Sequence, residues 1–169
     1  MDTTTSPRKP RVIVVGVDGS EQSITALELA AGLIPLAGDV IRAVTVWQYP
    51  VGYGTFAPID WNPAELAETA LDHALSAAFA DEPPCPVERR VLQGPAAHVL
   101  IDESKHASMV VVGSRGHGGF VGLLLGSVSS AVAERSACPV VIAHGPLRIQ
   151  GDDFSYEAPV ADHSATVSA

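Results

Sequence analysis

The chain has few cysteines and few basic residues for its length of 169. Cys85 and Cys138 are its two cysteines, too few for a disulfide framework and without the C-x-x-C spacing of a metal or redox pair. Ten lysines and arginines oppose 19 aspartates and glutamates, and the resulting net charge of −9 repels duplex DNA and other polyanions. The sequence therefore predicts two reduced thiols and no nucleic-acid partner.

Long apolar runs are also missing. The most hydrophobic stretches are short and end at glycine or proline, so none reaches the length of a membrane span. The first eleven residues are not followed by an apolar segment of signal-peptide length, and we expect a cytoplasmic protein with no membrane partner. With 47% hydrophobic and 17% charged residues, the chain has the composition of a globular domain.

Both ends of the sequence have the composition of tails. Residues 1–10 are polar and proline-rich, which predicts a flexible N-terminal tail. Residues 145–169 carry four acidic residues against Arg148 and show no apolar periodicity, which predicts an acidic, disordered C-terminal tail. One domain, residues 11–144, is expected between them.

Strand and helix patterns alternate along this domain. The first strand is almost wholly apolar, which is typical of a parallel strand buried on both faces. Asn62 and Pro63 form a helix-start signal, and an apolar stripe that includes Leu66 follows. Alternation of this kind predicts an α/β fold, a doubly wound parallel sheet with helices on both faces. The expected strands are 11–17, 40–49, 87–92, 108–113 and 139–143, and the expected helices are 20–33, 62–78, 96–105 and 127–137.

A glycine-rich loop joins the fourth strand to the fourth helix. Ligands of open parallel sheets bind beyond the carboxyl ends of the strands, which is where this loop, Gly113 to Gly126, is expected. Glycines let the main chain approach a ligand closely, and a helix N-terminus presents unpaired N–H groups. Residues 104–133 contain no aspartate or glutamate but include Lys105 and Arg115. These features favour a phosphate-binding loop that uses Arg115 and nearby serine hydroxyls.

Simpler interpretations of the same residues stay open. The glycines could only build turns, and Arg115 could be a solvated surface charge. Asp18 ends the first strand in a Val-Asp-Gly-Ser turn. It is either a turn or capping residue, or an acceptor for ribose hydroxyls, an adenine amine or a metal-bound water. The aromatic loop at 50–60 either packs on the domain or covers a base.

Several catalytic signatures are absent. The glycine-rich loop holds no lysine, and no G-x-G-x-x-G follows the first strand, which disfavours Walker-type ATPases and dinucleotide dehydrogenases. Ser114 does not sit in a G-x-S-x-G nucleophile elbow, and His117 has no neighbouring carboxylate in the sequence. The histidines also lack metal-ligand spacing. We therefore predict no catalytic residue and no metal-ligating side chain.

The spacing Gly113-x-x-Gly116-x9-Gly126-Ser127 resembles that of the universal stress protein family, in its ATP-binding branch. The likeness runs from about Arg11 to Ala143 and includes the Val-Gly-Val-Asp-Gly-Ser opening. The resemblance implies a Rossmann-like, five-stranded parallel sheet in the order 3-2-1-4-5. It also implies binding of ATP or a related adenine nucleotide together with Mg²⁺.

The resemblance further implies roles for individual positions. Gly16, Val17 and Asp18 would meet the adenine and ribose, and Val46 would touch the adenine. The residues that would line the ribose and hold the phosphates are Val112, Gly113, Arg115, Gly116, Gly126, Ser127, Val128 and Ser129. Members of the family also form homodimers through the last strand. Val140 to Ala143 agrees with this, because an uncovered apolar edge strand invites pairing with a second copy.

Three functions are compatible with these features. The first is a dimeric regulatory module of the stress response, in which nucleotide occupancy is read by a protein partner. The second is a slow ATPase or a phosphotransferase, with His117 or a loop serine as the phosphate acceptor. The third is a chaperone-like scaffold with a vestigial pocket. A complete binding loop without an evident general base favours the first.

Overall fold

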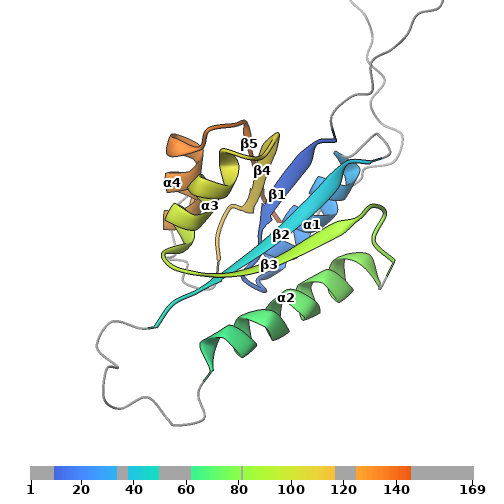
Figure 1. Ribbon diagram of the computed structural model, residues 1–169, viewed down its shortest axis with the longest axis horizontal. Coiled ribbons are helices and arrows are strands. Elements are labelled where there is room, and N and C mark those ends of the chain that lie inside the picture. Colours follow the sequence, from blue (N-terminus) through green and yellow to red (C-terminus); the bar gives the residue numbers. More distant parts are fainter. Residues whose placement is uncertain (1–9, 34–37, 50–61, 81, 117–124, 146–169) are drawn as a thin grey trace, which may run out of the picture.

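Figure 1 shows the computed structural model of the chain. The structure describes residues 10–33, 38–49, 62–80, 82–116 and 125–145. Apart from Pro10 and Gly145, the predicted tails lie outside these residues, as does the aromatic loop at 50–60, so the predictions for them remain expectations. Within the described ranges, no helix is long and apolar enough to cross a membrane.

Strands and helices alternate along the described chain in the predicted order. All strand pairs are parallel, and the strands form a five-stranded sheet in the order β3-β2-β1-β4-β5. The expected topology is therefore confirmed. The elements are β1 (Val12–Gly16), α1 (Glu21–Gly32), β2 (Val40–Trp47), α2 (Pro63–Phe79), β3 (Val87–Gln93), α3 (Ala96–Ser104), β4 (Met109–Gly113), α4 (Ser127–Arg135) and β5 (Val140–Ala143).

The sheet separates two apolar cores, and its central strands are buried on both faces. Ile13 and Val15 of β1 belong to the core that includes residues of α1 and α2. Val14, between them, belongs to the core that includes Leu100 of α3 and Val132 of α4. Alternation with a period of two places neighbouring side chains on opposite faces of a strand. Helices therefore cover both faces as predicted, and Figure 1 shows α3 and α4 together on one side of the sheet.

The first two helices begin at side-chain caps. The Ser20 hydroxyl accepts a hydrogen bond from Ser23 N, and the Asn62 side chain accepts from the main chain of the first turn of α2. The apolar stripe of α2 differs from the prediction at one position. Leu66 is 58% exposed, and Ala67, with Leu71 behind it, occupies the core. Ala67, Leu71 and Ala74 are buried with i, i+4, i+7 spacing, and Leu66 is rotated away from that face by about 100°.

An ion pair with a buried carboxylate joins the amino ends of the neighbouring strands β1 and β2. Asp39, immediately before β2, is 0% exposed. Arg11, immediately before β1, donates to its carboxylate from the main-chain N at 2.9 Å, from Nε at 3.0 Å and from Nη2 at 2.8 Å. Three donors to one carboxylate offset the cost of removing its charge from water. This pair lies at the end of the sheet away from the loops that follow β1 and β4.

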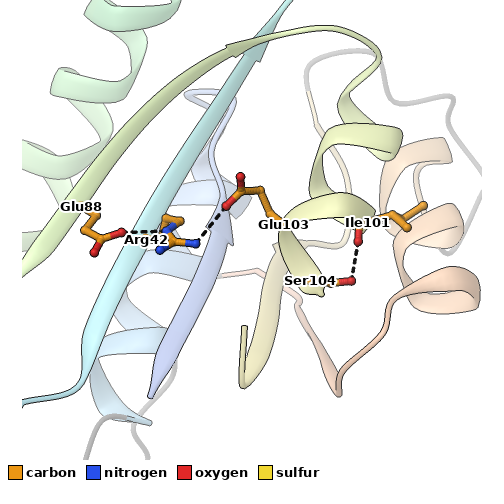
Figure 2. Close-up of polar contacts among 5 residues, drawn as sticks. All are labelled: Arg42, Glu88, Ile101, Glu103 and Ser104. Atoms are coloured by element: carbon orange, nitrogen blue, oxygen red, sulfur yellow. Dashed lines mark hydrogen bonds and ion pairs between the residues drawn. The ribbon is translucent and has the colours of Figure 1, made fainter. Parts of the chain in front are cut away.

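A second set of polar contacts holds α3 against its neighbours (Figure 2). Arg42 of β2 donates to Glu88 of β3 at 2.7 Å and to Glu103 of α3 at 3.1 Å. Ser104, at the end of α3, accepts from Ala137 N at 2.9 Å, which ties α3 to the turn before β5. These contacts fix the carboxyl-terminal half of α3 and so define where its first turn meets the ends of the strands.

Candidate functional site

A cavity lies at the carboxyl ends of β1 and β4, where the sheet changes its direction of winding. The chain leaves β1 for α1 on one face and leaves β4 for α4 on the other, so a crevice opens between the two connections. Its volume is about 430 Å³. Small-molecule sites usually measure roughly 300 to 1,000 Å³, so this cavity has the size of a ligand site.

All twelve residues implied by the family resemblance line this one cavity. They come from the end of β1, from Val46 on β2, and from the segments on either side of the loop between β4 and α4. The structure thus brings the predicted residues together, while their contacts with a ligand remain predictions. Five lining residues were not predicted, namely Ser23, Val44, Ala96, Leu100 and Leu125.

The floor of the cavity is apolar, and strand and helix periodicity explains which side chains form it. Val44 and Val46 are two residues apart on β2 and share one face, which the sequence could have revealed once Val46 was assigned. Leu100 of α3 lies over Gly16, where an added Cβ would stand 3.0 Å from the Leu100 Cδ1 and 3.2 Å from the Val112 Cγ1. Glycine at this position lets the two side chains close the floor. Such a surface suits the face of an aromatic base.

Val46 lies at the cavity, two residues beyond the last residue of β2 that pairs with β1. The pairing of β1 with β2 ends at Gly16 and Val44, and Val17 N then donates to Val44 O at 2.9 Å. The Trp47 carbonyl accepts from Gly94 N and so faces the β3 side. Because main-chain groups alternate sides along a strand, the N–H and C=O of Val46 point to the β1 side, beyond the end of β1. Val46 therefore offers one donor and one acceptor next to the apolar floor.

Asp18 stands at the cavity within a short hydrogen-bonded turn. Its Oδ1 accepts from Ser20 N at 3.0 Å and from Ser20 Oγ at 2.6 Å. The same Ser20 hydroxyl accepts from Ser23 N and caps α1. Asp18 is exposed to solvent and also lines the cavity. Asp18 is therefore a turn residue whose carboxylate also lies at the cavity, because the turn fixes the position of that carboxylate.

Three glycines of the predicted loop serve different purposes. At Gly113 an added Cβ would come within 2.8 Å of the Gln22 Cβ and 2.9 Å of its carbonyl carbon, so glycine is needed for α1 to pack against the end of β4. At Gly116 it would overlap the Asp18 Oδ2. At Gly126 the three nearest atoms all lie at 3.6 Å, an ordinary contact, and φ is −73°. The ligand-free fold therefore does not require glycine at position 126.

The two ends of the loop between β4 and α4 are joined by hydrogen bonds. Gly126 N donates to Ser114 O at 2.8 Å, and the Ser129 hydroxyl lies 3.0 Å from both Ser114 O and Gly126 O. Ser129 lines the cavity but is 3% exposed, and its hydroxyl is directed at main-chain carbonyls. Ser127 is exposed at the first position of α4. His117 lies outside the described residues, as do the loop positions that follow it up to 124.

The electrostatic character of this side of the cavity favours an anion. The N-cap of α4 is Gly126, with no side-chain cap and no acidic residue in the first turn. Amide groups at a helix N-terminus without a capping side chain carry a partial positive charge that attracts anions. The exposed Arg115 adds a full positive charge beside them. The cavity thus combines an apolar floor with a polar rim that carries the Arg115 guanidinium, the amides of α4 and the Asp18 carboxylate.

Thiol and metal chemistry have little support in the described part of the chain. Cys85 and Cys138 are free, and burial raises the pKa of each thiol, so both stay protonated at neutral pH. Among the described residues, no three histidine, cysteine, aspartate or glutamate side chains gather as metal ligands. Asp18 is the one acidic side chain among the described residues that line the cavity.

Fold and cavity define a doubly wound α/β domain with a ligand-sized pocket at its topological switch point. The family model of the universal stress protein family matches residues 10–144. A universal stress protein of Mycolicibacterium smegmatis is 38% identical over 133 residues, which cover 77% of this chain and 44% of that protein. The chain belongs to the universal stress protein family. It spans about half the length of the curated relatives it matches.

Solved structures of the family share the fold. Universal stress protein UspA from Lactobacillus plantarum superposes with a TM-score of 0.60 at 19% identity, covering 81% of this chain and 99% of that one. A universal stress protein in complex with cAMP superposes with a TM-score of 0.55 at 28% identity, covering 80% of this chain and 97% of that one. These similarities confirm the Rossmann-like architecture.

Proposed function

We propose that the chain binds an adenine nucleotide in the cavity, with ATP and its Mg²⁺ as the ligand, and acts as a dimeric regulatory module in a stress response. The observation that carries the proposal is the main chain of Val46, whose N–H and C=O point beyond the end of β1, between the apolar floor and the rim with Arg115 and Asp18. The similar protein solved with cAMP supports an adenine-containing ligand. The proposal also includes a protein partner that reads nucleotide occupancy and a stress that changes it.

Each part of the nucleotide has a matching part of the cavity. Adenine offers an amine donor next to a ring-nitrogen acceptor, and Val46 offers a carbonyl next to an N–H, so two hydrogen bonds can form. The Asp18 carboxylate accepts from ribose hydroxyls while Ser20 holds it in place. The phosphates bind the first-turn amides of α4, the Ser127 hydroxyl and Arg115. The ligand is thereby recognised at both ends.

Mg²⁺ fits this site only as a companion of the nucleotide. It prefers phosphate oxygens, waters and one or two carboxylates, and Asp18 is the one carboxylate among the lining residues that the structure describes. When bound, the ion neutralises phosphate charge. Among the described lining residues Asp18 is the one candidate general base, and Ser20 donates to it twice; His117 lies outside these residues. Two donated hydrogen bonds make Asp18 a weaker base, so the described residues favour retention of the nucleotide over its turnover.

Calorimetric titration tests the binding proposal. In Mg²⁺-containing buffer we expect ATP, ADP and AMP to bind saturably with one site per chain, and GTP to bind about 100-fold more weakly than ATP. The reason is that guanine presents an acceptor and a donor where adenine presents a donor and an acceptor, so both groups of Val46 would be left unpaired. Absence of saturable binding by every adenine nucleotide would refute the proposal.

The dimer is proposed to form through β5, which is an edge strand. Val110 N donates to Pro139 O, and Ser114 N donates to Ala143 O, so alternate residues of β5 face β4. The main-chain groups of Val140 and Ile142 consequently point away from the sheet. Within the described residues no strand lies beyond β5, and an apolar edge strand of this kind is suited to pairing with a second copy.

Replacing Ile142 by proline tests this interface. Proline removes the outward N–H of residue 142, while the hydrogen bonds from β5 to β4 belong to its odd-numbered neighbours. We expect the native protein to sediment as a dimer and Ile142→Pro as a monomer that keeps its circular dichroism. Ile142→Val, which retains the N–H, is the control and should remain dimeric. A folded Ile142→Pro variant that still sediments as a dimer excludes β5 as the interface.

A further inference from the structure

The two ends of the loop between β4 and α4 meet at a neck formed by Ser114, Gly126 and Ser129. The contacts of the Ser129 side chain there differ from those expected of a phosphate ligand. The resemblance implies that Ser129 holds a phosphate. In the structure its hydroxyl lies 3.0 Å from Ser114 O and 3.0 Å from Gly126 O. Both neighbours are carbonyl oxygens, which only accept hydrogen bonds. The single proton of the hydroxyl is therefore shared between the two ends of the loop.

Burial reinforces this assignment. Ser129 is 3% exposed, whereas Ser127 and Ser130 on either side of it are exposed. Breaking the bonds to the carbonyls in order to face a phosphate would leave Ser114 O with Gly126 N as its remaining donor. Gly126 O would likewise keep Ser130 N, so both carbonyls stay partnered; what is lost is the bond from Ser129 to Ser114 O, which links α4 to the start of the loop. The arrangement is thus suited to holding the chain and poorly suited to contacting a ligand.

We propose that Ser129 is a positioning residue that closes the neck of the loop and so sets the geometry of the phosphate site. This inference rests on the proposed function for its ligand. Closing the neck places the main chain of Arg115 beside the start of α4, where a Cβ added to Gly126 would stand 3.6 Å from the Arg115 Cα. The cationic side chain and the helix amides are thereby held on adjoining sides of the same space. Ser129 acts on the phosphates through these groups.

The inference is tested with Ser129→Ala, with Ser129→Thr as the conservative variant and Ser127→Ala as the comparison. Threonine in a helix can direct its hydroxyl to the carbonyl three residues earlier, which is the bond that Ser129 makes to Gly126 O. Alanine is a good helix former and leaves the fold intact. Two quantities are measured: the hydrogen exchange rate of the Gly126 amide in the ligand-free protein, and the affinities for ATP and adenosine.

We expect Ser129→Ala to accelerate exchange of the Gly126 amide about 5-fold or more, because that amide is bonded within the neck. We expect it also to weaken ATP binding about 10-fold while adenosine affinity is retained, and Ser129→Thr to restore both quantities. Ser127→Ala should weaken ATP without changing the exchange rate. Weaker ATP binding by Ser129→Ala with unchanged Gly126 exchange would mean direct phosphate contact and would overturn the inference, as would no change in either quantity. Failure of the unaltered protein to bind any adenine nucleotide refutes the proposed function separately, since the exchange measurement needs no ligand.

Discussion

Gly126→Val is expected to reduce ATP affinity by about 100-fold or more, equivalent to roughly 2.7 kcal/mol, while lowering the free energy of unfolding by about 1 kcal/mol or less, because valine is a poorer N-cap than glycine. The ligand-free structure has room for a Cβ at this position because the nearest atoms to an added Cβ lie at 3.6 Å and φ is −73°. The bound state does not, because the proposed phosphates lie against the first turn of α4, which Gly126 precedes. The measurement is calorimetric titration with Mg²⁺-ATP, alongside urea unfolding of the ligand-free variant.

A matched control separates this steric effect from a general effect of removing glycine. Gly32, the last residue of α1, also has open space around an added Cβ, with no atom within 4 Å, and it lies outside the cavity lining. Gly32→Val should therefore bind ATP like the unaltered protein. Gly126→Ala should fall between the two. Unaltered ATP affinity in a folded Gly126→Val variant would show that the phosphates do not approach this main chain.

Arg11→Met is expected to lower the free energy of unfolding by about 3 kcal/mol. The side chain of Asp39 is 0% exposed and that of Arg11 is 36% exposed, so the two halves of this ion pair are not equivalent. Removing Arg11 leaves a fully buried carboxylate without its guanidinium, whereas removing the carboxylate leaves an arginine that water can reach. Methionine preserves most of the apolar stem, which confines the change to the charge. Urea denaturation monitored by circular dichroism gives the stability.

Two further variants decide whether the buried charge is the cause. Asp39→Asn, introduced together with Arg11→Met, removes that charge and should recover part of the lost stability. Arg89→Met breaks an ion pair with Asp72 in which both side chains are more than half exposed, and it should cost about 1 kcal/mol or less. Similar losses from Arg11→Met and Arg89→Met would contradict the argument. Nucleotide affinity should be unchanged in all three, because these residues lie outside the cavity lining.

Much of the fold follows from local patterns in the sequence. Apolar strands that alternate with helical segments predict a parallel sheet with helical crossover connections. The capping residues Ser20 and Asn62 correctly predicted the start of two helices. The strand order came from the family resemblance rather than from these patterns, because periodicity does not specify which strands are neighbours. The position of Leu66 was predicted wrongly, since one helical turn of apolar residues is compatible with two adjacent stripes.

The candidate site was predictable where main-chain motifs define it and less so where tertiary packing does. The glycine spacing and Asp18 were visible in the sequence, but Leu100 and Ala96 enter the cavity only because α3 crosses over the end of β1. No local pattern reveals that crossing. The reason for each glycine was likewise hidden, since the Gln22 main chain that excludes a side chain at Gly113 is distant in sequence. The same holds for Ser129, whose partners depend on how the loop closes.

The outward-facing main chain of Val46 has a consequence for how this pocket tolerates mutation. A base held by an amide and a carbonyl is held by groups that every residue other than proline possesses. Exchange of Val46 for isoleucine or leucine would therefore reshape the floor slightly and leave the pattern of donor and acceptor in place. Selectivity for a base that depends on main-chain hydrogen bonds can be retained when side chains change. Selectivity that depends on particular side chains is lost when they are replaced.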